Sequence, residues 1–98
     1  MDLTSRQRRT LRGLAQDLKA QLFVGHQGGT PGVLSSLEDL FRGRELVKGR
    51  VLPSCPSTAI QVASELAAAS GAAQVATIGR TFILFRPNPD IRDRIDIS

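Results

Sequence analysis

Residues 24–33 read VGHQGGTPGV and join a short apolar segment directly to the start of a helix. Thr30 suits the N-cap position, where its hydroxyl can accept a hydrogen bond from an early helical N–H. Pro31 suits the first helical position, because its missing N–H would be unpaired there in any case. Gly25, Gly28 and Gly29 allow positive φ values and a close approach of the backbone to a ligand. The stretch therefore predicts a strand, a tight turn and a helix, in that order.

The predicted turn could bind an anion. The helix that follows offers unpaired N–H groups and the positive end of its dipole, and phosphate is the natural ligand for such a site. A tight turn that binds nothing explains the spacing equally well, because short glycine motifs often match by chance. The turn lacks the Gly-Lys-Ser/Thr of a nucleoside triphosphate loop and the G-x-G-x-x-G spacing of a dinucleotide site, so both of these are excluded.

Further helices and strands are predicted on both sides of this turn. Thr4-Ser5-Arg6-Gln7 has the pattern of a capping box at the start of a helix. A later helix begins either at Pro56 or after a Thr58 cap, and Gly79-Arg80 suits a two-residue hairpin turn. Hydrophobic periodicity predicts helices at about 5–18, 31–42 and 56 or 59 to 70, and strands at about 21–24, 46–51, 73–78 and 81–86.

The predicted fold class is α/β, with one domain in the order α-β-α-β-α-β-β. Strand-helix-strand units pack as parallel strands covered by helices, whereas the last two strands form an antiparallel hairpin. The result is a four-stranded mixed sheet, and 98 residues suffice for one modest core. We expect the domain to span residues 1–89 and a charged tail to span 90–98, although three isoleucines in the tail leave open that it docks.

Several positions carry more detailed expectations. Gly43 is expected to be a left-handed stop after the second helix, and Gly49 marks either a bulge or a close backbone approach. Most of the four phenylalanines are interpreted as core, which argues against an aromatic platform for bases. The side chains predicted to face the core from the first and third helices are Leu11, Leu14, Ala15, Leu18, Ile60, Ala63, Leu66 and Ala67.

The charge balance favours an anionic partner. The chain has 13 Lys and Arg against 9 Asp and Glu, which gives a net charge of +4. Residues 1–89 contain 11 of the basic and 6 of the acidic residues. Such an excess points to nucleic acid or an anionic membrane, although it can also serve solubility alone. No apolar run approaches a membrane span and no secretory signal is evident, so we expect a cytoplasmic protein with no membrane partner. The single Cys55 excludes an intramolecular disulfide and suits a reducing compartment.

The sequence gives little support for catalysis. His26 is the only histidine, so there is no zinc spacing and no Cys/His pair, and we expect no metal and no cofactor. His26 could serve as a general base, but no nucleophile is paired with it. Two interpretations of His26 are better than a catalytic one, and they are equally good: an imidazole that contacts phosphate or a base, and an inert loop histidine. We therefore predict no catalytic residue and no small-molecule substrate.

A set of basic residues accompanies the glycine turn. Each of them alone is more often a solvated surface cation than a ligand, but together they favour recognition of structured RNA through its backbone and shape. The predicted RNA-binding residues are Gly25, His26, Gln27, Gly28 and Thr30 in and after the turn, Arg8, Arg9 and Arg12 on the first helix, Lys48 and Arg50 on one face of the 46–51 strand, and Arg80 at the hairpin.

Four motifs in order resemble the CRM (CRS1–YhbY) domain family, most closely its stand-alone bacterial YhbY-type members. They are the segments LTSRQR with LRGLA at residues 3–15, VGHQG with GV at 24–33, ELVK at 45–48, and IGRTFILFRP at 78–87. The resemblance covers about residues 3–87 and implies a fold similar to the C-terminal domain of bacterial translation initiation factor three. It also implies that Gly25 to Gly28 form the family's RNA-contacting G-x-x-G loop. Family members often carry a basic residue in this loop, where this chain has His26 and Gln27.

The family resemblance implies a function in ribosome assembly. Bacterial members are associated with precursors of the large ribosomal subunit, so we expect an RNA-binding, non-catalytic protein that acts as a monomer on ribosomal RNA or the pre-50S particle. A protein-interaction module that docks on ribosomal or assembly proteins is the alternative. An enzyme that uses His26 is a third and weaker hypothesis.

Overall fold

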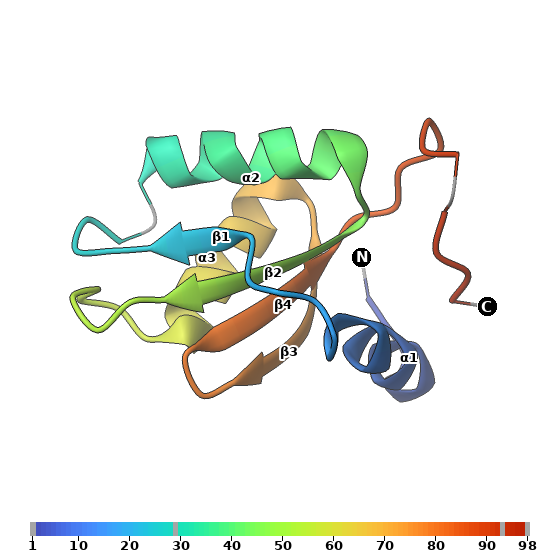
Figure 1. Cartoon of the computed structure of the whole chain (residues 1–98), viewed down its shortest axis with the longest axis horizontal. Coiled ribbons are helices and arrows are strands. Elements are labelled where there is room, and N and C mark those ends of the chain that lie inside the picture. The colour runs from blue at the N-terminus through green and yellow to red at the C-terminus, as the bar shows by residue number, and fades with distance from the viewer. Residues whose placement is uncertain (1, 29, 93, 98) are drawn as a thin grey trace.

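The computed structural model describes residues 2–28, 30–92 and 94–97 and has three helices and four strands in them (Figure 1). The predicted α/β class and element order are confirmed, and the Thr58 cap is the one used at the third helix. In chain order the elements are α1 (Ser5–Ala15), β1 (Leu22–Val24), α2 (Pro31–Gly43), β2 (Leu46–Val51), α3 (Ala59–Ser70), β3 (Ala73–Ile78) and β4 (Thr81–Phe85).

The sheet is mixed, and its strand order is β1-β2-β4-β3. β1 and β2 are parallel, as the α2 crossover requires, while β4 pairs antiparallel with both β2 and β3. The hairpin strand β4 therefore lies between β2 and β3. The ends of β1 and β2 and the β3–β4 hairpin consequently meet at one end of the sheet, where the glycine turn also lies (Figure 1).

Helices cover the two faces of the sheet unequally. α2 and α3 pack against one face, and α1 packs against β2, β3 and β4 on the other (Figure 1). Each face has its own apolar cluster. Phe41 and Phe82 are fully buried between the sheet and the helices α2 and α3, and Leu11 is fully buried between α1 and the sheet. In the described part of the chain α1 makes no contact with β1, so the α1 side of that edge strand is open.

Gly49 lies where the chain has no room for a side chain. It stands opposite Phe82 in the β2–β4 ladder, and a Cβ added to it would overlap the Phe82 ring. The predicted bulge is absent from this position, and the close neighbour of Gly49 is the Phe82 side chain rather than another backbone. The irregularity in the sheet lies elsewhere, between Gln74 and Ala76 of β3.

Some detailed expectations are wrong. Leu14 is 49% exposed and Ile60 is 66% exposed, because each helix packs on the sheet along a narrower or differently placed stripe than predicted. The buried side chains are Leu11 and Ala15 in α1, and Ala59, Val62, Ala63, Leu66 and Ala67 in α3. α1 ends at Ala15 rather than near residue 18, so Leu18 lies beyond it and is only half-buried. Gly43 has no positive φ, since Arg44 is extended and leads directly into β2.

The C-terminal segment docks against the domain through Glu45. The buried carboxylate of Glu45 accepts hydrogen bonds from the N–H groups of Asn88 at 2.7 Å and Ile95 at 2.6 Å, and pairs with Arg94. Burial raises the pKa of Glu45, but these bonds outweigh it and hold the pKa below its ordinary value. Ile95 and Ile97 pack on the α1 side of the core. The described part of the chain contains no helix with the length and apolarity that crossing a membrane requires.

Candidate nucleic-acid interface

The glycine turn is tied together by its own backbone. The Gly28 N–H donates to the Gly25 carbonyl at 3.0 Å, and the Thr30 N–H donates to the Gly28 carbonyl at 2.9 Å. Thr30 caps α2, as predicted, by accepting from the Val33 N–H at 3.4 Å. His26 and Gln27 are exposed, and their backbone N–H groups have no hydrogen-bond partner among the described residues. Two donors are thus free to bind an anion beside the N-terminus of α2.

The two described glycines of this turn have different structural roles. Gly28 has a φ of +67°, in the left-handed region that glycine favours. Gly25 does not use the positive φ that glycine allows, and a Cβ there would meet Leu52 and Ser54 at 3.8 and 3.9 Å, an ordinary contact distance. Gly29 lies outside the described residues. Only Gly28 among the described turn glycines is therefore required by backbone conformation.

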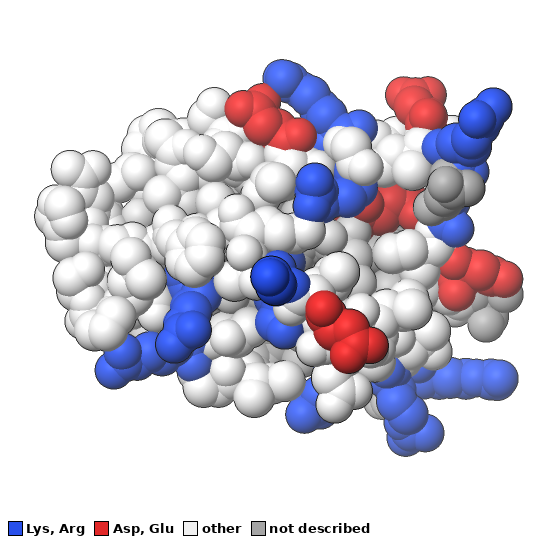
Figure 2. Space-filling view, viewed as in Figure 1, with Lys and Arg blue, Asp and Glu red and all other residues white. Residues whose placement is uncertain are grey.

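The turn itself carries no formal charge from Lys or Arg. The left end of the molecule in Figure 2, over the β1–α2 turn and the β2–α3 connection, shows neither basic nor acidic side chains. The nearest predicted cations come from the ends of neighbouring strands. Arg50 is the register partner of Phe23 in β1, and the Arg80 carbonyl accepts from the Val51 N–H at 2.8 Å. At about 4.8 Å per strand, Arg80 lies two strands, or about 10 Å, from β1.

The predicted arginines of α1 form a second group, away from the turn. The turn lies at one end of the 37 Å long axis and α1 lies towards the other (Figure 1). Arg9 and Arg12 line a groove of about 490 Å³ between α1 and the sheet, and Lys48 lies in the same groove. Arg8 lies further round α1, where its Nε donates to the Gln74 carbonyl at 3.4 Å. The predicted cations are thus divided between the turn and this groove.

Lys48 has a structural role that the sequence did not predict. Its Nζ donates to the carbonyls of Ala15 at 3.2 Å and Leu18 at 3.0 Å, at the end of α1. A cation there satisfies the free carbonyls and the negative end of the helix dipole. Lys48 therefore holds α1 on the sheet, and part of its hydrogen-bonding capacity is already used.

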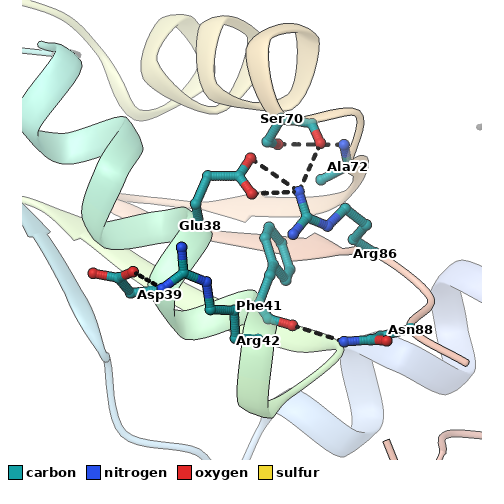
Figure 3. Close-up of polar contacts among 8 residues, drawn as sticks. All are labelled: Glu38, Asp39, Phe41, Arg42, Ser70, Ala72, Arg86 and Asn88. Carbon is teal, nitrogen blue, oxygen red and sulfur yellow. Dashed lines mark hydrogen bonds and ion pairs between the residues drawn. The ribbon is translucent and has the colours of Figure 1, made fainter. Parts of the chain in front are cut away.

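Arg86 is also committed to the fold. Figure 3 shows its guanidinium between α2 and the end of α3, where Nη1 lies 2.9 Å from both Glu38 oxygens and from the Ser70 carbonyl. The same group lies 4.6 Å from the centre of the buried Phe41 ring. Of the six cations predicted for the site, four have no ion pair or side-chain hydrogen bond to the described residues and can meet an anion, namely Arg9, Arg12, Arg50 and Arg80.

One exposed aromatic residue was not predicted as part of the site. Phe23 is 55% exposed, whereas the other three phenylalanines are buried. Leu22 and Val24 face the α2 and α3 side, so strand alternation turns Phe23 to the open α1 side. The sequence shows the same alternation of side chains in this strand. It does not show which side faces the core, because a strand of three residues gives too short a pattern to assign the faces.

The described side chains offer no metal site. No group of three or more His, Cys, Asp or Glu residues is placed to hold an ion within residues 2–28, 30–92 and 94–97. His26 is exposed at the turn, and Cys55 is a free, half-buried thiol. The arrangement of the candidate site is that of a binding surface of backbone donors and cations.

Comparisons with known proteins agree on one family. The family model for the CRS1 / YhbY (CRM) domain matches residues 3–86. A Haemophilus influenzae protein named RNA-binding protein is 32% identical over 92% of this chain and 91% of its own length. A Bacillus subtilis protein named probable RNA-binding protein YqeI is 32% identical over 90% of this chain and 92% of its own. The solution structure of a hypothetical protein from Staphylococcus aureus has a TM-score of 0.78 at 27% identity, over 91% of this chain and 93% of that one.

Proposed function

The chain belongs to the CRS1 / YhbY (CRM) domain family, and on that premise we propose that it is a non-catalytic RNA-binding protein that acts on ribosomal RNA or the precursor of the large ribosomal subunit. Relatives that match it over nearly their whole length are named RNA-binding proteins. The ribosomal target is what the family resemblance implies. The observation that carries the proposal is the pair of backbone N–H groups at His26 and Gln27, which have no partner among the described residues, with Arg50 and Arg80 at the ends of the neighbouring strands.

These groups suit phosphate better than any other ligand. The N–H groups of the turn can donate to phosphate oxygens, and the N-terminus of α2 favours negative charge. Arg50 and Arg80 add charge that the turn lacks, since guanidinium groups pair with phosphate through two hydrogen bonds. Arg9 and Arg12 would meet the same RNA further along the molecule. Such contacts set affinity and register and carry little base sequence information.

Crosslinking in cells followed by sequencing of the bound RNA tests the target. We expect reads concentrated on ribosomal RNA of the large subunit. Reads spread over messenger and transfer RNA in proportion to their abundance would contradict the ribosomal assignment.

Binding to naked ribosomal RNA separates RNA recognition from docking on a protein. The double variant Arg50→Gln/Arg80→Gln should bind more weakly in a gel-shift titration, because two phosphate contacts are lost. Arg42→Gln/Arg44→Gln is a matched control that also removes two charges: both arginines are exposed at the C-terminal end of α2, where Arg42 pairs with Asp39 at 2.9 Å (Figure 3). Equal affinity of the two variants would refute the assignment, and no binding by the wild type would favour the protein-interaction alternative.

A further inference from the structure

Phe23 stands in a row of side chains that crosses the whole sheet. The ladders pair Phe23 with Arg50, Arg50 with Thr81, and Thr81 with Ile78. All four therefore lie on the face that α1 covers only in part. The row spans four strands, or about 14 Å at 4.8 Å per strand.

Both ends of this row are apolar and exposed. Phe23 is 55% exposed at the β1 edge, and Ile78 is 50% exposed at the β3 edge. Arg50 is exposed between them. An exposed aromatic ring beside an exposed arginine, on a flat surface, is the arrangement that stacks an unpaired base and holds its phosphate.

The charged side chains in the groove next to this row indicate which kind of ligand it binds. Ile78 and Thr81 also line the groove under α1, together with Arg9, Arg12 and Lys48. No acidic side chain lines this groove in the described part of the chain. An exposed aromatic ring and an exposed arginine, in a row that continues into a groove lined by cations, complement a nucleic acid strand better than an apolar protein segment.

We propose that the row Phe23–Arg50–Thr81–Ile78 is a site for single-stranded RNA, in which an unpaired base stacks on Phe23 and the adjoining phosphate pairs with Arg50. The inference rests on the proposed RNA-binding function and adds the class of RNA. The glycine turn contacts phosphates whether or not their bases are paired. Phe23 requires a base that is free of its partner, so the site selects loops, bulges or single strands over continuous duplex.

The test compares two RNAs and two substitutions at one position. The probes are a seven-nucleotide uridine oligomer with a central 2-aminopurine and a fourteen-base-pair RNA duplex. Phe23→Leu keeps an apolar side chain without the ring, and Phe23→Tyr keeps the ring. Ile60→Ala removes a comparably exposed apolar side chain from α3, the helix on the other side of the sheet, and serves as the control.

We expect Phe23→Leu to weaken binding of the single-stranded probe by about fivefold to tenfold, the lower part of the range for loss of one base stack. Affinity for the duplex should stay unchanged, and Phe23→Tyr and Ile60→Ala should bind both probes as the wild type does. Equal loss on both probes, or no loss, would overturn the stacking site. In that case the wild type would still bind RNA, whereas a wild type that binds neither probe would refute the proposed function itself.

A measurement on the unmodified protein provides a second test if Phe23→Leu does not fold. The wild type should quench the 2-aminopurine fluorescence, and the Phe23 ring protons should shift upfield in the nuclear magnetic resonance spectrum when the oligomer is added. Binding that leaves the Phe23 ring protons unshifted would overturn the proposal.

Discussion

Replacing Gly49 by alanine tests the close packing of the Phe82 ring against β2. Gly49 lies between Lys48 and Arg50 in β2, and a Cβ there would overlap the ring of the fully buried Phe82. The ring cannot move aside without disturbing the α2 and α3 core, so we place the cost at about 3 kcal/mol, the upper end of the range for overpacking. The lower backbone entropy of alanine in the unfolded chain returns about 1 kcal/mol.

The expected net loss for Gly49→Ala is therefore about 2 kcal/mol, or a fall in Tm of roughly 8–16 °C for a domain of this size. Thermal and urea unfolding followed by circular dichroism measure both quantities. Gly13→Ala is the matched control, because a Cβ at this helical position meets nothing within 4 Å. That substitution should stabilise the protein by about 0.5–1 kcal/mol.

The overlap also predicts a coupling between the two residues. Phe82→Leu should destabilise the wild type by opening a cavity, but it should cost less in the Gly49→Ala background, because the new Cβ fills part of that space. A Gly49→Ala protein as stable as the wild type, or a double variant with strictly additive losses, would refute the steric argument.

Substitutions at three other positions test separate features of the fold. Glu45→Gln should loosen the C-terminal segment, measured as faster amide exchange at Ile95. Because folding lowers the pKa of Glu45, its contribution to stability is present above the ordinary value of 4.5 and is lost as pH falls through the folded value, so Glu45→Gln should flatten the pH dependence of Tm. Gly28→Ala should lower the free energy of unfolding by about 1–2 kcal/mol because of the positive φ at this position, whereas Gly28→Asn should lower it less, since asparagine tolerates this conformation. Equal losses of stability in the two variants would contradict the role given to the backbone conformation. Lys48→Met should lower the free energy of unfolding by about 1 kcal/mol, because the hydrogen bonds from Lys48 to the carbonyls of Ala15 and Leu18 are lost. Thermal unfolding followed by the helical circular dichroism signal measures this loss.

Local chemistry made most of the fold readable from the sequence. The Thr4 and Thr30 caps and the Gly79 hairpin each fix an element boundary within a few residues, and all three are found in the structure. The end of α1 was less predictable, because it depends on Lys48, which lies 33 residues away from Ala15 in the chain. Contacts of that range leave no periodic signal in the sequence.

The candidate site was only partly predictable for the same reason. The turn and its Thr30 cap follow from adjacent residues, so the sequence places them correctly. The separation of the α1 arginines from the turn depends on where α1 packs, which helical periodicity does not specify. The row that contains Phe23 and Ile78 depends on strand order and register across β4, a strand that follows both in the chain.

The salt dependence of affinity for a ribosomal RNA fragment tests RNA binding most directly. Of the six cations predicted for the site, four make no ion pair or side-chain hydrogen bond to the described residues, namely Arg9, Arg12, Arg50 and Arg80. With about four phosphates neutralised, the logarithm of the binding constant should fall with the logarithm of the salt concentration at a slope of roughly −3. A slope near zero, with affinity unchanged between low and moderate salt, would contradict binding through phosphates.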